Sequence, residues 1–210
     1  MARARNEELR ELITRTAWKQ FRERGYDKTT FASIAEECGV SRELAHYHIG
    51  KKETLAIDLI DHVAEEAMVA LGPGYDDGST LAVYAGGSCS FNYLVNVGGF
   101  GRLLLDVLSR RELTDKLVDV EVKWMRDLST GGANSQEANR LLTMVIGGFN
   151  ELMYAQLSAS GTCDVFELVA FAINAARTLY RQSASGETDP LPKDAEFVAK
   201  IAEASARIRL

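Results

Sequence analysis

The sequence predicts an all-α protein, and three observations support this fold class. Only three prolines occur in 210 residues, so most of the chain contains no strong helix breaker. Alanine, leucine, glutamate and arginine dominate long stretches, whereas few runs are rich in β-branched residues. Apolar residues also recur at helical spacing along much of the chain. The content of 46% hydrophobic and 26% charged residues is ordinary for a globular protein of one or two domains.

Three helices are predicted before residue 50. The first has apolar residues such as Ile13 and Phe21 at helical spacing, and Gly25 ends it as a C′ glycine would. Thr30 supplies an N-cap for the second helix. Gly39 opens a tight turn that leads to the third helix. The predicted ranges are 7–24, about 31–38, and 42 to about 48.

A longer helix is predicted from residue 51 to about 71, where aliphatic residues again stand in line. Residues 72–79 carry the strongest loop signal of the chain, with three glycines and a proline. We place the domain boundary there, so that residues 1–50 form an N-terminal domain, 51–71 a linking helix and 72–210 a second helical domain. Further helices are expected near 80–97, 99–110, 112–129, 135–159, 163–182 and 194–208.

The charge of the chain is unevenly distributed. The net charge is −6, but residues 1–60 hold 11 lysines and arginines against 10 acids, or +1. Residues 61–210 hold 13 against 20, or −7. Because charges beyond a Debye length of roughly 8 Å are largely screened, the acidity of the second segment does not exclude nucleic-acid binding by the first.

The cysteines and the apolar runs indicate the compartment. Cys38, Cys89 and Cys163 are widely separated and lack metal-ligand spacing, so we expect reduced, packed thiols, with a redox-sensing thiol as the alternative. The N-terminus leads into a charged helix, and no apolar run reaches the length of a membrane span. We therefore expect a cytoplasmic protein without a signal peptide or membrane partner.

Residues 30–55 have the pattern of a helix-turn-helix. In this motif a first short helix crosses the DNA backbone, and a turn around a glycine lets a second helix pack across it. The second helix then offers its exposed side chains to the major groove, which is wide enough for an α-helix. The side chains that the pattern leaves available to DNA are Arg42, Glu43, Leu44, His46, Tyr47 and His48.

The wider N-terminal pattern resembles the tetracycline-repressor (TetR) family of transcriptional regulators over about residues 9–60. It reads Ile13-x3-Ala17-x3-Phe21-x3-Gly25-Tyr26-x2-Thr29-Thr30-x3-Ile34-Ala35-x3-Gly39-Val40-Ser41, followed by Gly50-x-Lys52-Glu53-x-Leu55. The resemblance implies an all-helical homodimer with a three-helix DNA-binding domain. It also implies a fourth, linking helix and a C-terminal domain that binds a ligand and forms the dimer.

The resemblance further implies a role for each residue of the DNA-binding surface. Thr30 would cap the second helix and bind a phosphate, and Lys52 would bind another phosphate. The start of the recognition helix would meet base edges, and the cluster that follows would contact phosphate and sugar. These two groups are Arg42, Glu43 and Leu44, and then His46, Tyr47 and His48.

The sequence departs from the family pattern at several positions. Ala45 replaces a common leucine and Ile49 a common aromatic residue, and we expect Trp18 to fill the space that these changes leave. Glu43 is unexpected next to phosphates, so it either accepts a hydrogen bond from cytosine or turns away from DNA. Ala32 stands where an arginine is frequent and removes one DNA contact.

The C-terminal part predicts a largely apolar cavity for a small-molecule effector. Aromatic residues, methionines and amides lie among aliphatic residues on its helices. An amide on an apolar face needs hydrogen-bond partners, which a ligand can supply. Core packing is the alternative for each of these residues. The predicted lining residues are Phe91, Asn92, Phe100, Trp124, Met144 and Phe149.

The two long helices near 135–159 and 163–182 carry wide apolar faces. Small residues such as Ala172 and Ala176 permit another helix to approach closely. The resemblance implies that these helices pair with their copies in a homodimer, whereas an intramolecular hairpin core is the alternative.

We therefore expect a dimeric repressor that binds a palindromic double-stranded DNA operator and leaves it when an effector binds. An activator or a ligandless regulator is the alternative within the same class, and a helical ligand-binding protein with a vestigial helix-turn-helix is the alternative outside it. No enzyme is expected, because no carboxylate pair, Ser/His/Asp set or phosphate-binding glycine loop stands out. No cofactor or metal site is predicted, since His46 and His48 point about 200° apart on a helix.

Overall fold

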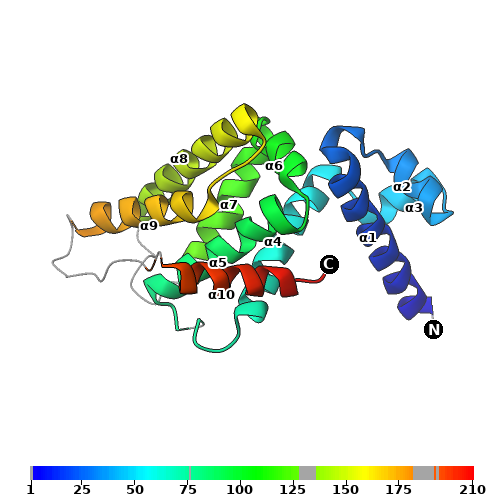
Figure 1. Ribbon diagram of the computed structural model, residues 1–210. Coiled ribbons are helices and arrows are strands. Elements are labelled where there is room, and N and C mark those ends of the chain that lie inside the picture. Colours follow the sequence, from blue (N-terminus) through cyan, green and yellow to red (C-terminus); the bar gives the residue numbers. More distant parts are fainter. Residues whose placement is uncertain (1, 76, 128–135, 182–191, 193) are drawn as a thin grey trace.

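The computed structural model describes residues 2–75, 77–127, 136–181, 192 and 194–210. Across these residues every regular element is a helix, so the prediction of an all-α fold is confirmed (Figure 1). None of the described helices is both long and apolar enough to cross a lipid bilayer. The N-terminal domain consists of α1 (Ala2–Lys28), α2 (Phe31–Cys38) and α3 (Arg42–Ile49).

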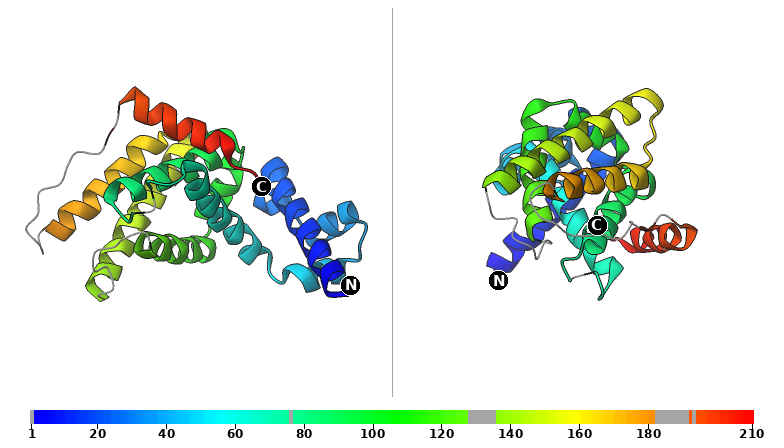
Figure 2. Two further views of the ribbon diagram at one scale, coloured as in Figure 1. Left: turned by 90° about the horizontal axis from the view of Figure 1, so that it is seen from below. Right: turned by 90° about the vertical axis from the view of Figure 1, so that its left-hand side faces the viewer.

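A fourth helix, α4 (Lys52–Leu71), runs from the N-terminal domain into a larger helical bundle (Figure 2). The helices of this C-terminal bundle begin and end close to the ranges that the sequence predicts. The expected helix ends at residues 129, 135 and 182 lie outside the described residues. The bundle contains α5 (Thr80–Asn92), α6 (Gly101–Leu108), α7 (Arg111–Asp127), α8 (Gln136–Ser160), α9 (Val165–Arg181) and α10 (Ala195–Arg207).

Two elements differ from the prediction. α1 is divided at Gly25, whose φ of 81° is non-helical, so the first helix ends where the sequence predicts and a short second helical segment then runs to Lys28. The single helix expected over 80–97 is divided, because a π-helical turn (Tyr93–Val97) follows α5. The amide of Gly98 donates to the carbonyl of Tyr93 at 2.6 Å. The two residues are five positions apart in the sequence, which is the separation that defines a π-helical turn.

α5 lies at the centre of the bundle, and small residues at several of its positions allow its neighbours to approach closely. It packs against α4, α9 and α10, and its residues from 82 to 92 are all buried. A Cβ at Gly86 would lie 2.7 Å from the sulfur of Met68 and 3.0 Å from the ring of Trp124. A Cβ at Gly87 would lie 3.2 Å from Cγ1 of Val169. The two glycines therefore let α4, α7 and α9, which carry these three side chains, pack closely on α5.

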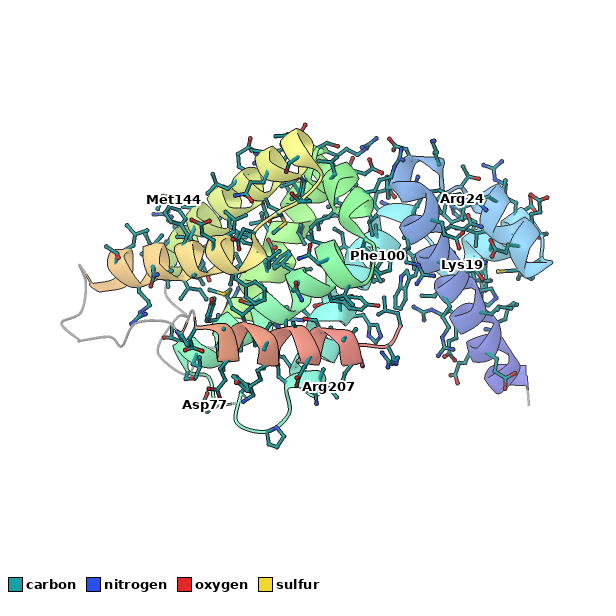
Figure 3. The ribbon with its side chains drawn as sticks, viewed as in Figure 1. Lys19, Arg24, Asp77, Phe100, Met144 and Arg207 are labelled. Atoms are coloured by element: carbon teal, nitrogen blue, oxygen red, sulfur yellow. The ribbon has the colours of Figure 1, made fainter. Side chains whose placement is uncertain are left out.

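α8 and α9 lie side by side at the edge of the bundle (Figure 1). Their inner residues, such as Met153 and Ile173, are buried. Their outer face carries large apolar side chains, because Met144 is 57% and Phe171 61% exposed. Figure 3 shows Met144 on the outer side of α8. The pair thus has one apolar face in the core and a second on the surface.

Candidate functional site

Local hydrogen bonds fix the start of α2 and the turn that follows it. Thr30 Oγ1 accepts a bond from the amide of Ser33, and Ser33 Oγ accepts one from the amide of Thr30, both at 3.1 Å. This reciprocal pair is a capping box. Gly39 adopts the left-handed conformation (φ 66°) and ends α2. Ser41 Oγ then accepts a bond from the amide of Leu44 at 3.1 Å and starts α3.

The core of the N-terminal domain accommodates a small residue on α3. Ala45 is fully buried where α3 packs against α1 and α2. The contacts of Trp18, which was expected to fill space here, run to α4 instead. Its indole N–H donates to the carbonyl of Leu55 at 3.3 Å, and its ring stacks on His62 with 5.2 Å between the ring centroids. Trp18 follows the buried Ala17 by one residue, so it points about 100° away from the inward direction.

The face of α3 that points away from this core carries most of the residues expected to contact DNA. Tyr47 is 76% exposed and Leu44 37% exposed, and Arg42 and His46 are exposed as well. His48 is half-buried, with the ring of Tyr47 packed edge-on against it at 5.4 Å between centroids. A short helix with exposed aromatic, apolar and cationic side chains offers contacts to base edges and to sugar and phosphate.

Glu43 takes a position that the sequence left open. Its carboxylate accepts hydrogen bonds from its own backbone amide and from Ser41, and these bonds lower the pKa of Glu43. The carboxylate is therefore directed to the N-terminus of α3, where a negative charge is favourable. Of the two alternatives from the sequence, the structure favours a side chain that turns back on its own helix.

A groove of about 520 Å³ joins the starts of α2, α3 and α4. It brings together four of the residues that the sequence singled out: Thr30, Arg42, His46 and Lys52. His46 packs against Phe31 in this groove, with 4.9 Å between the ring centroids. Phe31 and Lys51 also line the groove, although the sequence reasoning assigned neither of them to DNA. A lysine doublet at the very start of the helix predicted over 51–71 was the signal for Lys51.

Lys52 makes contacts within the protein that its assignment to a DNA phosphate did not anticipate. Its Nζ donates to the carbonyls of Tyr26 at 2.9 Å and Thr29 at 3.0 Å. It also lies 3.9 Å from the centroid of the Tyr26 ring. Burial lowers the pKa of Lys52, against the opposing effects of nearby acidic groups. Two of its three N–H donors thus bind the turn between α1 and α2.

The same turn connects the N-terminal domain to the C-terminal bundle. The amide of Tyr26 donates to Asp106 Oδ2 on α6 at 2.8 Å. Both Nη2 bonds of Arg110, which follows α6, go to the carboxylate of Asp27, at 2.5 and 2.7 Å. Burial raises the pKa of Tyr26, and the centroid of its ring lies 3.9 Å from Lys52 Nζ and 5.7 Å from Arg110 Cζ. A displacement of α6 would therefore act directly on the end of α1 through these contacts.

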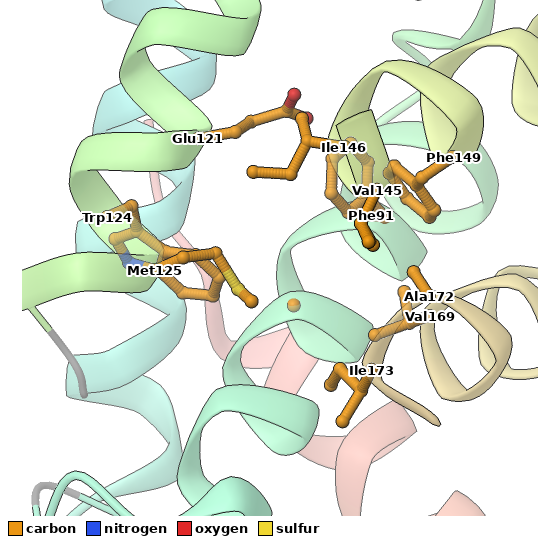
Figure 4. A pocket seen from close by; sticks show the side chains of 11 residues that line it. Phe91, Glu121, Trp124, Met125, Val145, Ile146, Phe149, Val169, Ala172 and Ile173 are labelled. Carbon is orange, nitrogen blue, oxygen red and sulfur yellow. The ribbon is translucent and has the colours of Figure 1, made fainter. Parts of the chain in front are cut away.

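The C-terminal bundle contains a pocket of about 60 Å³ between α5, α7, α8 and α9 (Figure 4). Three of the six predicted lining residues, Phe91, Trp124 and Phe149, lie in its wall. Phe91 and Phe149 meet edge to face, with 5.0 Å between their centroids. The full lining consists of Gly87, Phe91, Glu121, Trp124, Met125, Val145, Ile146, Phe149, Val169, Ala172 and Ile173.

The other three predicted lining residues do not line this pocket. Asn92 is buried, but its amide donates to Ser205 Oγ at 3.1 Å, because α10 supplies the partner that we expected from a ligand. Phe100 is buried next to Tyr93, with 6.3 Å between the ring centroids. Met144 is on the outer face of α8, one residue before the pocket residue Val145 and turned by about 100°.

Glu121 is the pocket residue that the sequence reasoning missed. Among the described residues of the lining it is the single ionisable side chain, and it is only 9% exposed. Asn150 Nδ2 donates to its Oε2 at 2.7 Å, whereas its Oε1 has no hydrogen-bond partner among the described residues. Burial raises the pKa of Glu121 to about 8, and the bond from Asn150 opposes this effect. The sequence did hold a signal, because Leu113, Leu117 and Glu121 are four residues apart on the inward stripe of α7.

Comparison with known proteins identifies the N-terminal part. No curated protein matches the sequence. The family model described as bacterial regulatory proteins, tetR family, matches residues 13–59, which run from α1 through α2 and α3 into α4. This part of the chain is a DNA-binding domain of the TetR type. The helix-turn-helix, the capped start of α2 and the exposed face of α3 thus all lie in the segment that matches the TetR-family model.

Solved TetR regulators share the fold over the length of the chain. FadR of Thermus thermophilus, a TetR-family repressor seen in complex with lauroyl-CoA, is 18% identical with a TM-score of 0.57, covering 88% of this chain and 100% of FadR. RolR in complex with resorcinol is 16% identical with a TM-score of 0.57, covering 89% and 98%. TylP of Streptomyces fradiae is 22% identical with a TM-score of 0.54, covering 100% and 95%. At these identities the likeness shows the fold alone.

Proposed function

We propose that this TetR-family regulator is a repressor that binds a palindromic operator as a homodimer and releases it when a small molecule occupies the C-terminal pocket. The exposed face of α3, placed beside the groove at the start of α2 and α4, is the observation that carries the proposal. It joins groups for base edges to cationic groups for phosphates on one side of the N-terminal domain.

On DNA, α3 enters the major groove. Arg42, at the first position of α3, is exposed and reaches guanine with two hydrogen bonds. The exposed Lys51 and the capped N-terminus of α2 at Thr30 face a phosphate on one side of the groove. Tyr47 and His48 contact sugar and phosphate on the other. Glu43 stays on the N-terminus of its own helix and takes no part in base recognition.

The homodimer forms through the outer face of α8 and α9. Met144 and Leu152 on α8 and Phe171 on α9 are 57%, 41% and 61% exposed. Gly147 and Gly148 lie between the first two, and a Cβ at either glycine would meet no atom within 4 Å. Exposed apolar side chains, with two glycines between them that leave room for another helix, suit a two-fold contact in which each pair of helices packs on its copy.

Release follows from the contacts between the pocket, α6 and the N-terminal domain. An effector that prefers one arrangement of the bundle shifts the equilibrium toward that arrangement, and one that binds both equally shifts nothing. α6 holds the end of α1 through Asp106, so its displacement changes the position of α3. The two copies of α3 must dock about 34–36 Å apart or at a multiple of this spacing, so a few ångströms abolish simultaneous docking.

Selection from a pool of random duplexes tests the proposal. The wild-type chain should enrich a palindromic sequence whose half-sites are one or two helical turns apart. A variant with both Arg42→Ala and Tyr47→Ala should lose this enrichment. The control variant Arg111→Ala, in which a side chain that is 89% exposed is removed from the start of α7, should keep it. Failure of the wild-type chain to enrich any sequence at low salt would contradict the proposed function.

A further inference from the structure

The pocket between α5, α7, α8 and α9 has apolar walls and one ionisable group. Figure 4 shows the side chain of Glu121 extending from α7 toward Ile146 on α8, with the aromatic rings of the lining around the same space. The remaining lining side chains are aliphatic, aromatic or thioether groups, apart from Gly87, which has none. A ligand in this space therefore meets apolar surface everywhere except at one carboxyl group.

Glu121 is held in place but left incomplete as a hydrogen-bonding group. Its Oε2 accepts a bond of 2.7 Å from Asn150 Nδ2, which fixes the carboxyl group against α8. Its Oε1 has no partner among the described residues, and neither has Oδ1 of Asn150. Burying a polar atom without a partner costs about 1–3 kcal/mol, so a group with two such atoms is expensive for a purely structural role. Both unpartnered atoms are acceptors when the carboxyl is ionised, so they call for a donor.

The surroundings of Glu121 also lack a counter-charge. Among the described residues no other ionisable side chain lines the pocket, and burial and the bond from Asn150 are the two effects that shift the pKa of Glu121. An ionised Glu121 is therefore unfavourable in the empty pocket, and a cation that enters would remove this disadvantage. The rings of Phe91, Trp124 and Phe149 add to the preference, because aromatic faces attract cations.

We propose that the pocket binds a lipophilic amine whose ammonium group donates to Oε1 of Glu121 and whose apolar body lies against the aromatic and aliphatic walls. This inference rests on the proposed function, since it names the effector class of the same regulator. A fatty acid or another anion would face a carboxyl group without a counter-charge. A neutral alcohol or phenol would make one hydrogen bond with the carboxyl group but would gain nothing from its ionised form, which only a cation stabilises.

The size of the empty pocket restricts the ligand further. About 60 Å³ is far below the roughly 300–1,000 Å³ of typical small-molecule sites. A single ring with a short aminoalkyl chain is thus the best first probe. The half-buried Met125 forms part of the wall, and its flexible thioether can shift to admit such a ring.

Four probes of similar shape test the inference: 2-phenylethylamine, 2-phenylethanol, 3-phenylpropionate and propylbenzene. Isothermal titration calorimetry on the full chain should show that the amine binds at least about tenfold more tightly than each of the other three. Because Glu121 is largely protonated in the empty pocket at pH 7, binding of the ammonium form should release a proton. Titrations in buffers of different ionisation enthalpy measure that release.

Variants then locate the effect. Glu121→Gln keeps the shape and a hydrogen-bonding group but not the charge, so it should weaken the amine about tenfold or more and abolish proton release. Its affinity for 2-phenylethanol should stay within about threefold of wild type. Asp119→Asn, an exposed acid on the same helix, is the matched control and should change nothing. Thermal unfolding of each variant by circular dichroism establishes that it is folded.

The results separate this inference from the proposed function. Equal affinity for the amine and the alcohol, no binding of the amine, or an unchanged affinity in Glu121→Gln would each overturn the amine site. Operator binding would remain intact in all three cases. If the amine binds through Glu121 but does not weaken operator binding, the site stands and release by this ligand is refuted.

Discussion

Lys52→Met separates two roles that a lysine at this position can have. In the structure, Lys52 Nζ donates to the carbonyls of Tyr26 and Thr29 at 2.9 and 3.0 Å and lies 3.9 Å from the centre of the Tyr26 ring. Methionine retains an apolar stem of similar length but removes the charge and both bonds. Hydrogen bonds from a charged group contribute about 1.5–3 kcal/mol each, and part of this is offset because the freed carbonyls of a half-buried site can bind water.

We therefore expect Lys52→Met to lower the free energy of unfolding by about 1–3 kcal/mol. For a chain of this length the melting temperature should fall by roughly 3–10 °C. The neighbouring Lys51 is exposed, so Lys51→Met is the matched control and should change stability by no more than about 0.5 kcal/mol. On DNA the order should reverse, because loss of Lys51 should lower the slope of log K against log salt by about 0.9 per subunit.

Thermal and urea unfolding of the two variants measure the changes in the free energy of unfolding. DNA titrations between roughly 50 and 200 mM salt measure the slope of log K against log salt. Equal melting temperatures for wild type and Lys52→Met would refute the structural role. A loss of salt dependence in Lys52→Met together with unchanged stability would return this lysine to the phosphate role that the family resemblance implies.

Three further outcomes follow from the bundle. Phe171→Asp should raise the dimer dissociation constant at least about 100-fold, because burying a phenylalanine contributes about 2 kcal/mol and a two-fold interface contains this residue twice. Analytical ultracentrifugation measures the dissociation constant, and Val69→Asp, at another exposed position, is the control. Glu121 has a pKa raised to about 8 in the folded chain, so its contribution to stability is fully present below about pH 4.5 and is lost as pH rises through 8. Urea unfolding from pH 5 to 9 should therefore show a steeper decline for wild type than for Glu121→Gln, and parallel curves would contradict the assignment. Gly86→Ala should lower the free energy of unfolding by about 1–3 kcal/mol, because the added Cβ would lie 2.7 Å from the Met68 sulfur and 3.0 Å from the Trp124 ring. An unchanged melting temperature would show that α5 can move aside.

The N-terminal domain was predictable because its signals are local. Thr30 caps α2 through a residue three positions away, and Gly39 ends α2 in the conformation that glycine favours. Helical spacing likewise predicted the helices of the bundle. Lys52 was a different case, because its partners are carbonyls 26 and 23 residues earlier in the chain, and no pattern in the sequence shows which carbonyls a lysine will reach.

The pocket was only partly predictable for a related reason. An aromatic or amide residue on an apolar helix marks an inward face, but it does not show which neighbour fills the space. Asn92 meets Ser205 from the last helix, at a separation of 113 residues, and Met144 lies one position off the pocket stripe. Glu121 was more accessible to sequence reasoning, since a carboxylate in line with Leu113 and Leu117 indicates a buried acid.

The central claim, that α3 reads DNA, is tested most directly by one binding measurement. Fluorescence anisotropy would compare wild type, Arg42→Ala and the control Arg111→Ala on the selected operator and on a scrambled duplex of the same length. We expect Arg42→Ala to lose about 1–3 kcal/mol per half-site on the operator, with binding to the scrambled duplex nearly unchanged. If Arg42→Ala binds the operator as tightly as wild type and Arg111→Ala do, Arg42 does not read base edges from α3 and the account is contradicted.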